Sequence, residues 1–204
     1  MNMATSSHSR HSDARENILS VGRQIMARKG FSGVGLNEIL ATASVPKGSF
    51  YHYFSSKEAF GEALLEDYFE GYLAELDQTL QLPGLSMAKR LMAYFKQWQA
   101  NQSVLECQGK CLAVKLGAEV ADLSEDMRSS LDRGTAAIIK RLSGAIKAGV
   151  AEGSLSIGKN TPDRIAQSLY QLWLGASVMV KIVRHAEPFK TAMVTTRQIL
   201  QHSA

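Results

Sequence analysis

Cysteine, proline and long hydrophobic runs are all scarce in this chain of 204 residues. Its two cysteines exclude a scaffold held by disulfides and favour a reducing, cytoplasmic environment. The longest uncharged apolar run, Leu172 to Val180, is far shorter than the about 20 residues that a membrane-spanning helix needs, so no membrane partner is expected. Residues 1–12 contain no apolar segment, which predicts a flexible polar tail rather than a signal peptide.

The composition is otherwise that of an ordinary globular protein. Hydrophobic residues make up 45% of the chain and charged residues 21%, which excludes wholesale disorder. The net charge of +4 is unevenly spread, because residues 1–60 hold seven Lys and Arg against four Asp and Glu while the remainder is nearly balanced. A basic end on a near-neutral body indicates a polyanionic partner.

Apolar residues recur at helical spacing along most of the chain, and no stretch alternates as a strand would. The pattern predicts an all-α fold of about nine helices. The expected helices cover residues 13–30, 36–43, 47–54, 57–80, 87–100, 111–120, 124–151, 162–185 and 188–201. Their starts are predicted from N-cap residues at Ser12, Ser56, Ser124 and Thr161.

Two short expected helices, 36–43 and 47–54, are joined by Ser44-Val45-Pro46 and have the spacing of a helix-turn-helix. In such a unit the start of the second helix enters the major groove of DNA. Basic, hydroxyl and imidazole side chains would contact phosphates or base edges, and a glycine would allow close backbone approach. The candidate DNA-binding residues are Lys47, Gly48, Ser49, Tyr51, His52 and Lys57. A structural three-helix subdomain is the alternative on spacing alone.

Residues 30–60, GFSGVGLNEILATASVPKGSFYHYFSSKEAF, closely resemble the DNA-binding signature of TetR/AcrR-family regulators. The resemblance implies three N-terminal helices for DNA and a six-helix body for ligand and dimer contacts. We therefore expect a DNA-binding domain over residues 13–58 and a regulatory and dimerisation domain over 59–204, linked by the long helix 57–80. Ser44 departs from the family pattern, in which glycine is common, and Val34-Gly35 replaces the usual Thr or Ser cap.

Residues 109–128 and 169–188 resemble the NemR subgroup of this family, whose members respond to reactive electrophiles or oxidants through a cysteine. The resemblance implies a homodimeric repressor that leaves its double-stranded DNA operator when Cys111 is modified. Some related repressors sense acrylate-like ligands, so the alternative is gating by a non-covalent ligand, such as a short unsaturated acid, in the C-terminal pocket. Neither hypothesis implies a cofactor or a metal.

Cys111 would lie in the first turn of the helix 111–120, where the helix dipole, Lys110 and Lys115 favour the thiolate. The alternative is an inert buried thiol. Lys110 stands where the subgroup usually has glycine. Cys107 could resolve oxidised Cys111, whereas a metal site is not expected because no histidine or further cysteine lies nearby.

Lys181 interrupts the apolar helical segment 169–183, which is expected to be buried on several sides. It is predicted to be a pocket lysine near Cys111, and the alternative is a lysine that extends from the edge of an interface. Trp98 and Trp173 are further candidate pocket residues, for which a core position is the alternative. The last two helices, 162–201, are the expected dimer interface.

Enzymatic activity is not predicted. The chain contains no Ser-His-Asp arrangement, phosphate-binding loop, HExxH motif or paired carboxylates at useful spacing. A purely structural helical protein would leave the basic and aromatic residues of 47–52 unexplained.

Overall fold

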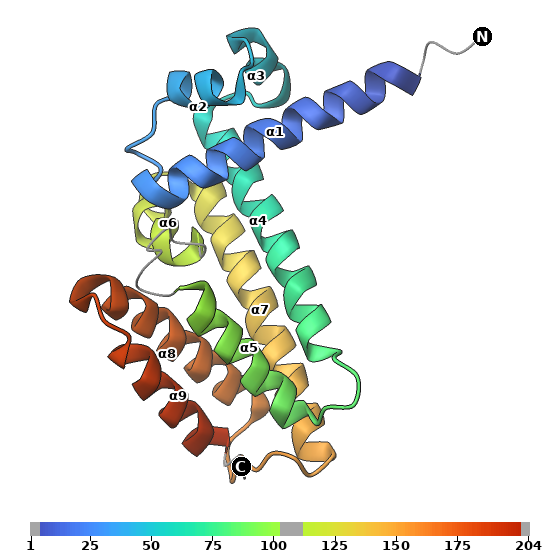
Figure 1. Ribbon diagram of the computed structural model, residues 1–204, viewed down its shortest axis with the longest axis vertical. Helices are drawn as coiled ribbons and strands as arrows, with labels where there is room; N and C mark the ends of the chain where they lie inside the picture. The colour runs from blue at the N-terminus through green and yellow to red at the C-terminus, as the bar shows by residue number, and fades with distance from the viewer. Residues whose placement is uncertain (1–4, 103–111, 201–204) are drawn as a thin grey trace. The chain divides into compact units, whose positions relative to one another are not determined.

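The computed structural model describes residues 5–102 and 112–200, and it confirms the all-α fold (Figure 1). Over these residues the chain forms nine helices and no strand. The helices are α1 (Thr5–Lys29), α2 (Leu36–Ala43), α3 (Lys47–Tyr53), α4 (Lys57–Leu80), α5 (Met87–Asn101), α6 (Leu112–Ala121), α7 (Glu125–Ala151), α8 (Pro162–Val183) and α9 (Glu187–Leu200). None of the helices described is both long and apolar enough to cross a membrane.

The chain divides into two compact units. The first unit comprises residues 1–69 and 111–132, which include α1 to α3, the beginning of α4, α6 and the beginning of α7. The second comprises residues 70–110 and 133–204, with the remainder of α4 and α7 and with α5, α8 and α9. The first unit therefore contains the segment 13–58 that is expected to bind DNA, together with α6 and the beginnings of α4 and α7.

The N-terminal helix begins earlier than the sequence predicts. The expected tail runs through residue 12 and the expected N-cap is Ser12, whereas α1 begins at Thr5. Residues 5–12 contain neither glycine nor proline, so this stretch has no residue that would stop the helix. At its other end α1 closes as expected, with Arg28 and Lys29 in the last turn and Gly30 at a φ of 81°.

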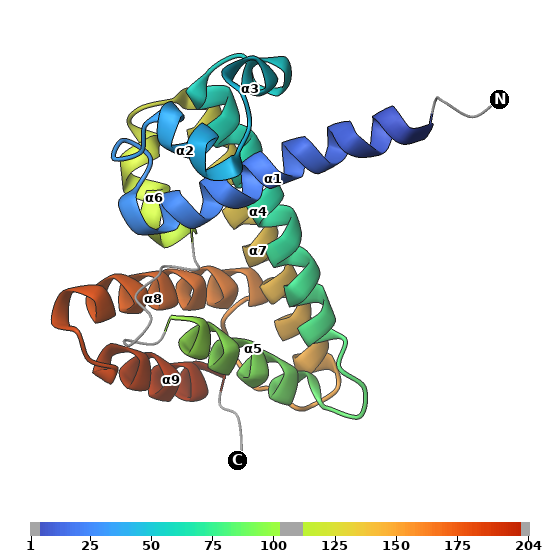
Figure 2. The ribbon, with the colours of Figure 1, turned by 45° about the horizontal axis from the view of Figure 1, so that its top comes forward.

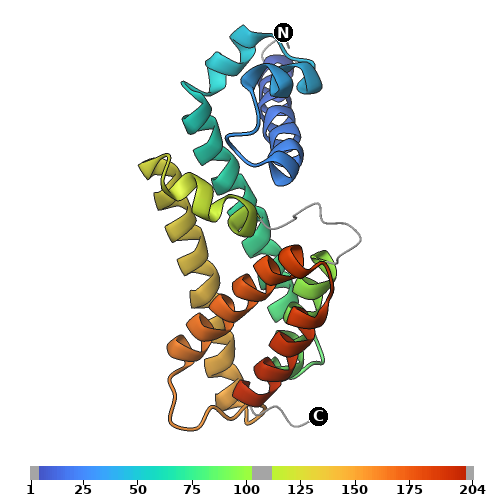
Figure 3. The same ribbon diagram turned by 90° about the vertical axis from the view of Figure 1, so that its left-hand side faces the viewer.

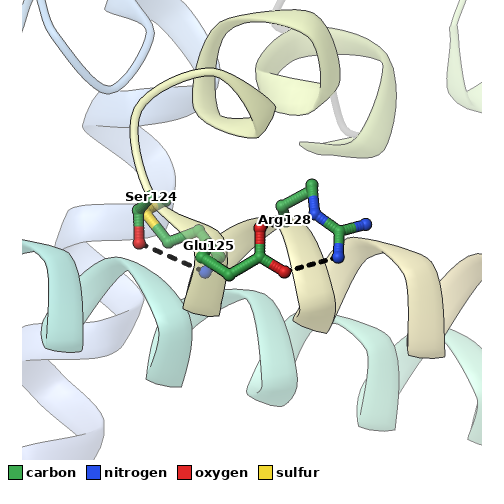
Figure 4. A network of polar contacts seen from close by, with 4 residues as sticks. Ser124, Glu125 and Arg128 are labelled. Atoms are coloured by element: carbon green, nitrogen blue, oxygen red, sulfur yellow. Dashed lines mark hydrogen bonds and ion pairs between the residues drawn. The ribbon is translucent and has the colours of Figure 1, made fainter.

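Three predicted N-caps are confirmed by hydrogen bonds. The side-chain oxygens of Ser56, Ser124 and Thr161 each accept from the backbone N–H three residues later, at 3.1, 3.3 and 3.3 Å. Figure 4 shows the cap of Ser124 beside the ion pair of Glu125 with Arg128 in the first turn of α7. Local side-chain chemistry therefore sets where α4, α7 and α8 begin.

In the second unit, α8 and α9 lie side by side (Figures 1 and 3). The last turn of α8 differs from the expectation, because the helix ends at Val183 and Arg184 adopts a left-handed φ of 57°. The apolar segment is also less buried than predicted: Val178, Met179 and Ile182 are exposed to solvent. Helix α8 thus presents an apolar face that nothing within the described chain covers.

Candidate nucleic-acid interface

An aromatic cluster fixes the inner side of α3. Phe50 is fully buried, and Phe54, which follows the last turn, is nearly so. Their ring centroids lie 5.2 Å apart, and each packs against Phe60 of α4, at 5.4 and 5.1 Å respectively. Figure 2 shows α2 and α3 as short neighbouring helices. Both of them contact α1. These rings hold the Phe50 side of α3 inward, and Gly48 and His52, on the opposite side of the helix, are exposed to solvent.

That solvent-facing side carries most of the predicted DNA-binding residues. Lys47, Gly48, Tyr51 and His52 are exposed, and Ser49 is half-buried. The ammonium nitrogen of Lys47 lies 5.9 Å from the centre of the Tyr51 ring, one turn along the helix. The structure therefore brings five of the six predicted residues together on one helix.

Lys57, the sixth, is half-buried at the start of α4. Its Nζ donates a hydrogen bond of 2.8 Å to the carbonyl oxygen of Phe31 and lies 4.4 Å from the centre of the Phe31 ring. We call residues 30–32, between α1 and α2, the Phe31 loop. The ammonium group of Lys57 thus ties the start of α4 to the Phe31 loop.

Glu119 of α6 binds the same loop from another side. Its Oε2 accepts the N–H of Phe31 at 3.1 Å, and its Oε1 accepts the N–H of Ser32 at 2.6 Å. Burial raises the pKa of this carboxyl group, but the hydrogen bonds from Ser32 and Phe31, together with the charge of Lys115, outweigh burial and hold the pKa below its ordinary value of 4.5. Sequence analysis missed Glu119, because the contact spans 88 positions and no local motif signals it.

The turn between α2 and α3 has the left-handed conformation that glycine favours. Ser44 ends α2 at φ 56° and ψ 40°, and its N–H donates to the carbonyl of Ala41. At the other end of α2, Gly35 is the N-cap and supplies no side-chain hydrogen bond. Both positions are those at which the sequence departs from the family pattern.

Trp98 and Trp173, predicted as pocket candidates, lie in the core of the second unit. Their indole N–H groups donate to Ser177 and Thr196 respectively, both at 2.9 Å. Trp173 is fully buried and stacks on Phe95, with ring centroids 5.0 Å apart. Both donors are therefore already used by core partners, which is the alternative that the sequence left open.

The remaining sensor candidates are described only in part. Cys111 and Cys107 lie outside the described residues. Lys115 is half-buried on α6 in the first unit, and Lys181 is half-buried on α8 in the second. Among the described residues, no cluster of three or more His, Cys, Asp or Glu side chains could hold a metal ion.

Comparison with known proteins identifies relatives along most of the chain. Residues 18–64 match the family described as bacterial regulatory proteins, tetR family. Residues 88–196 match the tetracyclin repressor-like C-terminal domain. The chain is 45% identical over 197 residues to the HTH-type transcriptional repressor NemR of Escherichia coli (strain K12), covering 95% of this chain and 96% of that protein. It is 34% identical over 174 residues to the HTH-type transcriptional repressor DhaR of Mycobacterium sp. (strain GP1), covering 85% of each. The crystal structure of E. coli NemR in its reduced form superposes with a TM-score of 0.88 at 45% identity, covering 94% of this chain and 99% of that one.

Proposed function

Since the chain belongs to the TetR family of bacterial regulatory proteins, we propose that it is a homodimeric repressor that reactive electrophiles or oxidants release from its operator through Cys111. The observation that carries the proposal is the exposed polar side of α3, fixed from behind by Phe50 and Phe54. A helix held in this way presents its side chains in one orientation, as readout of the major groove requires.

Helix α3 supplies the contacts to DNA. Lys47 neutralises a phosphate, and Ser49, Tyr51 and His52 donate to phosphates or base edges. The space around Gly48 is open, so the backbone can approach the duplex closely there. Lys57 contributes by holding the Phe31 loop against the start of α4.

A second copy of the chain covers the apolar face of α8 in this proposal. Val178, Met179 and Ile182 of α8 and Val194 of α9 are exposed. Exposed apolar patches on globular proteins mark interaction surfaces, and helix-turn-helix proteins use two-fold dimers to hold two half-sites of DNA. The dimer therefore places one α3 in each half-site.

The sensing step is nucleophilic addition at Cys111. The thiolate sulfur forms a bond to the β-carbon of a Michael acceptor, the carbon–carbon π pair moves to the α-carbon, and that carbon takes a proton from water. Lys110 and Lys115, together with the start of α6 at Leu112, favour the thiolate over the thiol. The E. coli relative has been crystallised in a reduced form, which supports a thiol as the regulated group.

The test is operator binding by fluorescence anisotropy, with DNA from the region upstream of the protein's own gene and with N-ethylmaleimide as the electrophile. We expect the wild type and Cys107→Ser to bind and then dissociate on treatment, while Cys111→Ser binds and stays bound. Equal release of the wild type and Cys111→Ser would reject Cys111 as the sensor and favour the non-covalent ligand hypothesis or another thiol. Absence of binding at low salt, where phosphate contacts are strongest, would contradict the assignment of this DNA segment as the operator.

A further inference from the structure

We propose that Glu119 is the positioning residue through which α6 controls the DNA-binding helices, by way of the Phe31 loop. The inference rests on the proposed function, because it concerns how modification of Cys111, directly before α6, reaches α3. Helix α6 and helices α1 to α3 belong to the same compact unit.

The Phe31 loop is held from three sides. The Glu119 carboxylate of α6 accepts its two successive N–H groups, at 3.1 and 2.6 Å. The Lys57 ammonium of α4 donates to the Phe31 carbonyl at 2.8 Å. The Phe31 ring is buried beside Gly61 of α4, where an added Cβ would come within 2.7 Å of it and within 2.6 Å of the Met127 methyl group of α7. The loop is thus the point at which α1, α4, α6 and α7 meet.

The loop is shaped to receive a carboxylate. Gly30 has a φ of 81°, which directs the N–H groups of Phe31 and Ser32 to the same carboxylate. A Cβ at Gly30 would lie 2.7 Å from Glu119 Oε2, so only glycine leaves room for the oxygen there. A carboxylate can accept both bonds with its two oxygens, whereas an amide offers one oxygen only.

The path from the loop to the DNA-binding helix is short. Lys57, which binds the Phe31 carbonyl, begins α4 and is separated from Phe54, the C-cap of α3, by two serines only. Phe60, one turn later on α4, packs against both Phe50 and Phe54. Displacement of α6 would withdraw the Glu119 carboxylate, leave two backbone N–H groups without their partner and release the loop that sets the position of α4 relative to α1.

Helix α6 is suited to carry the displacement. Glu119 lies about two turns along α6 from Leu112, the first residue after Cys111. One side of α6 is buried along its whole length, at Leu112, Leu116 and Val120. We therefore expect the helix to move as a rigid unit. A group added at Cys111 therefore acts at one end of a short packed helix whose other end holds the Phe31 loop.

The first test measures the release ratio, defined as the operator dissociation constant after N-ethylmaleimide treatment divided by that before it. We expect Glu119→Gln to lower this ratio about tenfold relative to the wild type, because only one of the two loop N–H groups keeps an acceptor. The matched control is Glu152→Gln in the second unit, a carboxylate that also accepts a backbone N–H, from Met87, but contacts no DNA-binding helix. Its ratio should equal that of the wild type.

If Glu119 had a purely structural role, Glu119→Gln would lower the melting temperature. It would also weaken operator binding by the same factor before and after treatment, so the release ratio would stay unchanged. That outcome overturns the proposal. Failure of the wild type to dissociate on treatment would contradict the proposed function itself, so the two failures are distinguishable.

A second measurement needs no variant at Glu119. Amide hydrogen exchange at Phe31 and Ser32 is followed in the wild type, free of DNA, before and after treatment with N-ethylmaleimide. We expect exchange at these two amides to become about tenfold faster, because the modification withdraws their acceptor. Unchanged exchange in a protein that has lost its operator affinity would show that α6 acts by another route, and would overturn the proposal.

Discussion

At the scale of the residue, Ser44 occupies a conformation that an L-amino acid with a side chain adopts at a cost. Its φ of 56° closes α2, and left-handed backbone costs a non-glycine residue about 1–2 kcal/mol. We expect Ser44→Gly to raise the free energy of unfolding by about 0.5–1 kcal/mol, the net effect after the greater freedom of glycine in the unfolded chain. Urea denaturation measures this change in unfolding free energy. The control is Ala41→Gly in the same helix, which should be destabilised by about 1 kcal/mol. A loss of stability in Ser44→Gly would contradict the argument.

The stabilising effect of Glu119 should depend on pH. Its pKa in the folded protein lies below the ordinary value of 4.5, because the hydrogen bonds from Ser32 and Phe31 outweigh burial. The stability that it contributes is therefore complete above about pH 4.5 and is lost as the pH falls through the folded value. We expect the difference in unfolding free energy between the wild type and Glu119→Gln to be largest near pH 7 and to shrink below pH 4.5. A difference independent of pH would show that the charge of the carboxylate has no part in holding the loop.

Residues whose roles depend on local sequence were predicted more successfully than residues whose roles depend on tertiary contacts. The exposure of Gly48 and His52 opposite Phe50 follows from helical spacing alone. The partners of Glu119 and Lys57 do not, because the loop that both bind lies far from them in sequence. An apolar stripe likewise cannot separate core tryptophans from pocket tryptophans, since both require the same spacing.

At the scale of the element, Gly22 sets how closely α1 approaches α4. A Cβ at this position would overlap the ring of Phe60 and press on Leu64. We expect Gly22→Ala to lower the free energy of unfolding by about 1–3 kcal/mol through overpacking, and to weaken operator binding because Phe60 anchors α3. Gly144 of α7 has no atom near its would-be Cβ, so Gly144→Ala should instead stabilise by about 0.5–1 kcal/mol. Chemical denaturation of the two variants measures both changes in unfolding free energy. If Gly22→Ala were stabilised as well as Gly144→Ala, α1 would be able to move away from α4.

The ends of helices were predictable where a side chain caps them and less so elsewhere. Ser56, Ser124 and Thr161 mark helix starts because their oxygens accept a backbone N–H three residues on. The start of α1 has no single marker, since several Ser and Thr residues before Ser12 could cap a helix as well as Ser12 does. The sequence also could not show that α6 packs with α1, because no pattern within a single helix specifies its neighbour.

At the scale of the whole molecule, the exposed face of α8 predicts that dimerisation and operator binding are lost together. Ile182 is 66% exposed, and a charge placed there would be buried unpaired between two copies. We expect Ile182→Asp to be a folded monomer by light scattering and to bind the operator at least about 100-fold more weakly, because each monomer holds a single half-site. The control is Val150→Asp on α7, which also replaces an exposed apolar residue, at 40% exposure, and should remain dimeric and bind normally. A dimeric Ile182→Asp with normal operator affinity would place the interface elsewhere, and the apolar face of α8 would then require another occupant.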